Sequence, residues 1–154
     1  MPINADMTDT APTALVKRRF NIPVGRLFDA WLDTSLLSQW MFGPNVRDEQ
    51  IVRLRNDPQE GGAFSFVVRR QANELDHIGV YKEISRPRRL VFTWAVLHAE
   101  KSDGESVVAL DFKPHGVGSE LRLAHELRPS WASFTERSVQ AWTKMLDALA
   151  KHVT

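Results

Sequence analysis

The sequence predicts an α+β fold in which a curved antiparallel sheet wraps around one long C-terminal helix. The last segment, residues 131–153, has apolar side chains three and four positions apart, as in an amphipathic helix. Most of the preceding chain alternates with the period of two that is typical of strands. Trp131 and Trp142 give the last segment two bulky rings, which need a large concave surface to cover them.

The C-terminal helix is expected to present one apolar face. At roughly 20 residues it would be about 30 Å long, enough to cross a small domain. Ser133 and Glu136 form a capping-box pattern at its start, and Ser130 is a second candidate N-cap one turn earlier. The residues that recur on the apolar face are Phe134, Ser138, Ala141, Trp142, Met145, Leu149 and Val153.

Length and composition predict one globular domain. The chain has 154 residues, of which 43% are hydrophobic and 25% are charged, as in ordinary globular proteins. Residues 1–12 are polar and show no periodicity, so we expect a disordered leader followed by a single domain at residues 13–154. The sequence contains neither a membrane span of about 18 apolar residues nor a signal peptide. With no cysteine in the chain, this pattern predicts a cytoplasmic protein.

The first third of the chain predicts one strand and two short helices. Residues 14–20 form the strand, and Pro23 opens the first helix. Asp33 can cap the second helix, which ends before Gly43. The apolar stripes of the two helices contain Leu27, Phe28, Trp31, Leu32, Leu36, Leu37 and Trp40.

Six strands are expected between these helices and the C-terminal one. They lie at residues 51–56, 63–69, 75–84, 90–96, 106–112 and 120–126. Turns are marked by Gly61-Gly62, by Pro87, by the triplet at residues 102–104 and by Gly116. The fourth of these strands is apolar on both faces, which indicates a central position in the sheet. In the last strand apolar and polar residues alternate, which is typical of a strand with one solvent-exposed face.

Several motifs, taken in order, resemble one protein family. They are FDAWLD at residues 28–33, LSQWMFGP at 37–44, Gly61-Gly62 with Phe64 and Phe66, RRLVFTW at 88–94 and QAWTKML at 140–146. Together they resemble the START-like (SRPBCC) superfamily. Within it they look most like the bacterial single-domain branch related to the activator of the heat-shock chaperone (Hsp90) ATPase. The resemblance covers nearly the whole chain from about Thr13 onward.

The resemblance implies a helix-grip fold. In that fold an antiparallel sheet curls around a long C-terminal helix, two short helices close one end, and a cavity lies between sheet and helix. It also implies a broad class of function, because members of the superfamily bind lipids, hormones and polyketides, and some cyclise or hydrolyse them.

Two histidines and one glutamate are candidate polar groups of such a cavity. His77 shares a predicted strand face with Tyr81, and His125 shares one with Leu123, so either imidazole could point inward or be a hydrogen-bonded structural residue. Glu83 is expected on the face of His77. A carboxylate in an apolar cavity would have a raised pKa and could act as an acid or base, whereas a solvated or arginine-paired Glu83 would not.

Other chemistries find little support in the sequence. The five histidines lack metal-ligand spacing and cysteine is absent, so we expect no metal and no cofactor. Gly61-Gly62 lacks the spacing of a phosphate-binding loop. The net charge is +1 and the basic runs alternate with acidic residues, so no nucleic-acid partner is expected. An exposed sheet edge could support a homodimer.

We predict that the protein binds, without catalysis, a small apolar or amphipathic molecule such as a lipid, polyketide or aromatic metabolite. Two alternatives remain: a cyclase or hydrolase that uses His77 and Glu83, and an interaction module of the chaperone-activator type with a solid core and an exposed apolar patch. The residues expected to hold the ligand are Trp40, Phe64, Phe66, Trp94, Trp142 and Met145, with His77, Tyr81, His125 and Ser138 as polar anchors.

Overall fold

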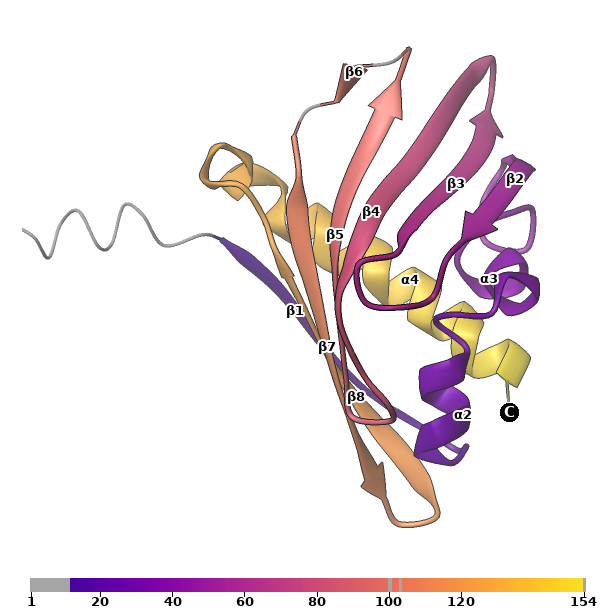
Figure 1. Ribbon diagram of the computed structural model, residues 1–154, viewed down its shortest axis with the longest axis vertical. Helices are drawn as coiled ribbons and strands as arrows, with labels where there is room; N and C mark the ends of the chain where they lie inside the picture. The colour runs from indigo at the N-terminus through magenta and orange to yellow at the C-terminus, as the bar shows by residue number, and fades with distance from the viewer. Residues whose placement is uncertain (1–11, 100, 103, 154) are drawn as a thin grey trace, which may run out of the picture.

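The fold is an eight-stranded antiparallel sheet that curls around a long C-terminal helix (Figure 1). The computed structural model describes residues 12–99, 101–102 and 104–153. The expected leader lies outside these residues except for Pro12, and so does Asp103 of the expected turn. In chain order the elements are β1 (Thr13–Phe20), α2 (Val24–Asp29), α3 (Thr34–Trp40), β2 (Gln50–Asn56), β3 (Ala63–Arg70), β4 (Asn73–Ser85), β5 (Arg89–His98), β6 (Lys101–Ser102), β7 (Ser106–His115), β8 (Gly118–Glu126), the 3₁₀ helix η1 (Pro129–Phe134) and α4 (Thr135–Val153).

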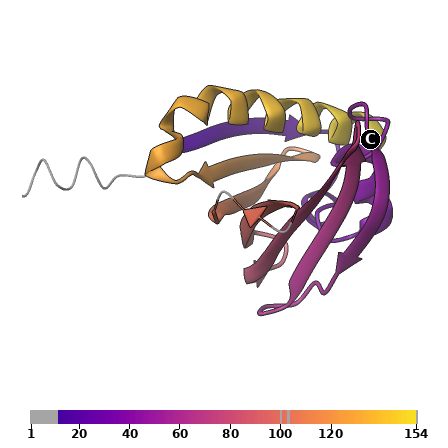
Figure 2. The ribbon, with the colours of Figure 1, turned by 90° about the horizontal axis from the view of Figure 1, so that it is seen from above.

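The strands follow the order β1-β8-β7-β5-β4-β3-β2, and the two-residue strand β6 pairs with β5. All neighbouring pairs are antiparallel. Figure 2 shows α4 lying along β1 at one edge while the rest of the sheet curls away beneath it. The predicted fold class is confirmed, and β5 lies inside the sheet as its two apolar faces indicated.

The start of the C-terminal helix differs from its prediction. The α-helical part begins at Thr135, after the 3₁₀ helix η1, rather than next to a cap at Ser133. The hydroxyl of Thr135 donates to the carbonyl of Ala132 at 2.8 Å, which ties the two helices together. Pro129 opens η1 because proline lacks the N–H that a first helical turn leaves unbonded. The capping-box pattern therefore placed the start of the α-helix one residue too early.

The interior between the sheet and α4 is filled mainly by aromatic rings. Trp31 lies near its centre, with ring centroids 4.6 Å from Trp40 and 6.0 Å from Trp142. Phe64 and Phe66 stack on each other at 4.8 Å. Because interiors pack as densely as organic crystals, these rings occupy most of the space under the helix.

A β-bulge in β4 places Glu83 on the opposite face from the one expected. The pairing with β5 shifts register between Tyr81 and Glu83, so Glu83 lies opposite Val91 while the following residue lies opposite the buried Leu90. Glu83 points to the outer face, where its carboxylate lies 3.3 Å from the guanidinium of Arg89. The predicted acid/base pair of His77 and Glu83 is therefore not assembled, because one extra residue reverses the alternation of a strand.

Candidate functional site

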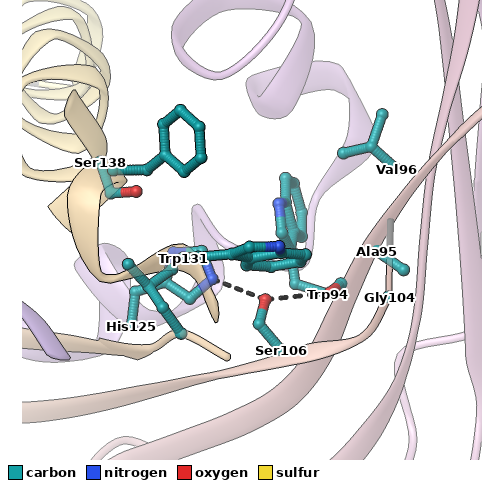
Figure 3. A pocket seen from close by; sticks show the side chains of 10 residues that line it. Trp94, Ala95, Val96, Gly104, Ser106, His125, Trp131 and Ser138 are labelled. Carbon is teal, nitrogen blue, oxygen red and sulfur yellow. Dashed lines mark hydrogen bonds between the residues drawn. The ribbon is translucent and has the colours of Figure 1, made fainter. Parts of the chain in front are cut away.

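An open pocket of about 300 Å³ lies where the curled sheet meets the first turns of the C-terminal helix (Figure 3). Strands β5, β7 and β8 contribute its floor, and η1 with α4 contributes the opposite wall. The lining is mainly apolar, with hydroxyl groups and one imidazole. Its residues are Trp94, Ala95, Val96, Gly104, Ser106, His125, Leu127, Trp131, Phe134 and Ser138.

The polar floor of the pocket is one continuous chain of hydrogen bonds. Trp142 donates its indole N–H to Nδ1 of His125 at 3.0 Å. An indole nitrogen only donates, so Nδ1 of the neutral ring must accept and the ring proton must lie on Nε2. Nε2–H then donates to the Ser106 hydroxyl at 2.7 Å, and that hydroxyl donates to the carbonyl of Trp94 at 3.0 Å. The chain leaves Ser106 Oγ one further acceptor position.

His125 is held neutral by this arrangement. Its side chain is buried, and burial lowers the pKa of His125 to about 4. Protonation would also turn Nδ1 into a donor that faces the donor of Trp142. The pocket floor therefore offers fixed hydrogen-bonding groups without a formal charge near neutral pH.

Three of the ten residues expected to hold a ligand line this pocket: Trp94, His125 and Ser138. Ser138 is half-buried, and its hydroxyl makes no hydrogen bond to any described residue. Trp94 lies at the boundary, since its ring lines the pocket and also contacts Trp142 at 5.8 Å. These residues place the pocket next to the aromatic core rather than inside it.

The other expected residues are buried in the core beyond the pocket wall. Trp40 donates its indole N–H to the carbonyl of Ala30 at 3.1 Å. Tyr81 donates its hydroxyl to Asn56 at 2.7 Å, and burial raises the pKa of that phenol well above its usual value. The remaining expected residues that lie in the core outside the pocket lining are Phe64, Phe66, His77, Trp142 and Met145.

His77 is a buried residue of the ring cluster. Its Nδ1–H donates to the carbonyl of Phe66 at 3.0 Å, and its ring centroid lies 4.8 Å from that of Phe42 and 5.4 Å from that of Trp94. Burial lowers the pKa of His77 to about 4, despite the opposing effect of the Phe66 carbonyl. The inward orientation that the strand period suggested is present, but Glu83 lies on the other face.

Several pocket residues were not singled out from the sequence, and Ser106 is the most important of them. It begins the inward face of β7 that continues through Val108, Leu110 and Phe112, so the period of two contained the signal. Trp131 and Phe134 were assigned to a regular helix, and the 3₁₀ geometry that places them at the pocket gave no separate signal. No group of three or more histidine and acidic side chains in the described residues could hold a metal ion.

The comparison with known families decides where this protein belongs. The sequence profile of the family described as "Activator of Hsp90 ATPase homolog 1-like protein" matches residues 21–154. The chain belongs to that family. The match spans both short helices, the sheet from β2 onward and the C-terminal helix, so it includes the whole pocket. No curated protein matches the chain.

Solved structures of other bacterial proteins share the fold. Protein CV1439 from Chromobacterium violaceum is 22% identical, with a TM-score of 0.78 over 92% of this chain and 96% of that one. The AHSA1 protein from Silicibacter pomeroyi is 24% identical, with a TM-score of 0.75 over 90% and 95%. CalU16 from Micromonospora echinospora is 23% identical, with a TM-score of 0.67 over 92% and 76%. At these identities the likeness concerns the fold alone. In the described part of the chain, no helix has the length and apolar character needed to cross a membrane.

Proposed function

We propose that this protein binds a small apolar or amphipathic molecule, such as a lipid, polyketide or aromatic metabolite, in the pocket between the sheet and the start of α4. The observation that carries the proposal is the pocket itself. Its volume of about 300 Å³ is at the lower end of the range for small-molecule sites, and its lining combines apolar side chains with a few fixed polar groups.

The polar groups are suited to orienting a ligand rather than to reacting with it. Both ring nitrogens of His125 are already bonded, so the imidazole is not free to take a proton from a ligand. The remaining acceptor position of Ser106 and the unbonded hydroxyl of Ser138 can each make one hydrogen bond to a bound molecule. Burial of the ligand's apolar surface, at roughly 25 cal/mol per Å² before association costs, would supply the driving force.

The interaction-module alternative has less support. It requires one continuous exposed apolar patch. The large exposed apolar side chains among the described residues are spread over β1, β2, β4, the turn between β7 and β8, and η1. They are Leu15, Val52, Val80, Val117 and Phe134. Of these, Phe134 lines the pocket, which again favours a small-molecule site.

The test is to fill the pocket without changing the fold. Ser138→Trp places a large ring in the lining, whereas Gln140→Trp places the same ring on the exposed side of α4. We expect native mass spectrometry of the purified protein, or a thermal-shift panel of fatty acids and aromatic compounds, to detect a ligand for the parent and for Gln140→Trp but not for Ser138→Trp. Equal binding by Ser138→Trp, or no binding by the parent protein, would contradict the proposal.

A further inference from the structure

One arginine lies at the rim of the pocket. The guanidinium carbon of Arg128 is 5.9 Å from the ring centroid of Trp131, and the same side chain passes over Gly104. A Cβ at Gly104 would collide with this guanidinium, and the φ of +121° at that position also favours glycine. Both Trp131 and Gly104 line the pocket, so the charge of Arg128 lies at its rim.

A second arginine lies near the same rim. The guanidinium carbon of Arg137 is 5.3 Å from the ring centroid of Phe134, which also lines the pocket. Neither Arg128 nor Arg137 forms an ion pair with any residue that the structure describes, although Glu105 and Glu136 are exposed close by in the sequence. The rim therefore has two positive charges that no acidic side chain in the described ranges neutralises.

Among the residues that the structure describes, no acidic side chain lines the pocket, and its imidazole is neutral at pH 7. The charge pattern is thus one-sided, with a neutral hydrogen-bonding floor and a cationic mouth. We infer that the ligand is an amphiphile with a single anionic group, a carboxylate or sulfonate, whose apolar body enters the pocket while its anionic end stays at Arg128. This inference rests on the proposed function and adds the ligand's charge and orientation to it.

The chemistry of arginine supports this choice. A guanidinium in cation–π contact with an indole still has planar N–H donors that can bind a carboxylate or sulfonate with two hydrogen bonds. The aromatic partner also limits the side chain's rotation, so less conformational freedom is lost on binding. Because Arg128 is exposed, the expected gain is modest.

The experiment uses two fluorescent probes that differ in charge. Anilinonaphthalene sulfonate and phenylnaphthylamine share the same ring systems, and only the first has a sulfonate. We expect the parent protein to bind the sulfonate probe more tightly than the neutral probe in fluorescence titrations. Arg128→Gln should weaken binding of the sulfonate probe by about fivefold and change binding of the neutral probe by less than about twofold. The sulfonate probe alone should lose affinity as salt is added.

Arg122→Gln is the matched control. Arg122 is exposed on the same strand as His125 but does not line the pocket, and its substitution changes the net charge equally. A circular-dichroism melt of each variant verifies folding. Equal weakening by Arg122→Gln, or no difference between the probes, would overturn the anionic-ligand inference while leaving the pocket as a binding site. If neither probe binds the parent protein, or if both still bind Ser138→Trp, the proposed function fails together with this inference.

Discussion

His125 is the residue on which the pocket floor depends. It connects α4 to the sheet, because its Nδ1 accepts from Trp142 while its Nε2–H donates to Ser106. Each bond is buried, so loss of one partner would leave the other group unsatisfied. The same geometry that favours ligand binding therefore also stabilises the fold.

Acidification should destabilise the protein through its two buried histidines. Folding holds the pKa of both His77 and His125 at about 4, compared with an ordinary value of 6.5. Above pH 6.5 the ring is neutral in both the folded and the unfolded state, so neither histidine makes stability depend on pH. Between pH 6.5 and 4 the unfolded chain binds protons that the folded chain does not, so stability falls as pH falls. Each histidine contributes roughly 3 kcal/mol to this loss.

Urea denaturation at a series of pH values measures this loss. His77→Gln and His125→Gln should each remove about half of the histidine-dependent slope, because glutamine does not titrate but can still form hydrogen bonds. His152→Gln, at an exposed position on α4, is the control. A free energy of unfolding that stays constant from pH 6.5 to 4.5 in the parent protein would contradict the prediction.

At the scale of single elements, the connection from α3 to β2 is held by a buried carboxylate. Glu49 accepts from the N–H of Gly43 at 2.8 Å, from Arg47 at 2.9 Å and from Arg70 at 2.6 Å. Burial alone would raise the pKa of Glu49, but the Gly43 N–H and the two arginines together hold it below its ordinary value. These bonds link the α3–β2 connection to the end of β3.

Removing the charge of Glu49 should therefore weaken this connection. Glu49→Gln leaves two arginines facing a neutral amide, and we expect a loss of about 2 kcal/mol in the free energy of unfolding. Glu74→Gln is the control, because its pair with Arg69 is half exposed and should cost less than about 0.5 kcal/mol. Equal losses for the two variants in denaturant titrations would show that burial of Glu49 has no special effect.

For the whole molecule, strands β3, β4 and β5 come into close contact around Gly79. Phe64 of β3 packs over Gly79 of β4, and the carbonyl oxygen of Thr93 of β5 approaches the same glycine. A Cβ at Gly79 would overlap both groups. Nearby, the Val80 N–H bonds to the Thr93 side chain at 2.9 Å. Glycine is needed at position 79 because neighbouring groups come so close that a side chain would not fit, and not because the backbone has a positive φ.

Gly79→Ala should accordingly destabilise the fold by about 3 kcal/mol or more, because the backbone oxygen of Thr93 cannot move aside independently. Gly116→Ala is the matched control. Gly116 has a φ of +59° but no heavy atom within 4 Å of an added Cβ, so its substitution should cost only about 1 kcal/mol. Thermal melts of the two variants distinguish them, and a mild effect at Gly79 would contradict the role given to close packing.

Much of the architecture could be predicted because it depends on local periodicity. The spacing of Trp142, Met145 and Leu149 predicted the long helix, and alternation along residues 120–126 predicted the last strand with His125 on the face of Leu123, which the structure places inward. The errors arose where one residue changes the pattern. Because of the bulge after Tyr81, Glu83 lies on the outer face instead of the face of His77. Because the 3₁₀ helix η1 comes first, α4 begins later in the sequence than predicted.

The sequence by itself determined the α+β class, the order of the main elements and the strand faces that His77 shares with Tyr81 and His125 with Leu123, because side-chain period is a local property of the chain. Only the tertiary structure decided that these two strand faces point inward, that most rings fill the core, that the open space lies beside Ser106 and Ser138, and that Arg128 lies at its rim. These features depend on how β5, β7, β8 and η1 pack against one another. Contacts between residues far apart in the chain produce no periodic pattern in the sequence, so they could not be predicted from it.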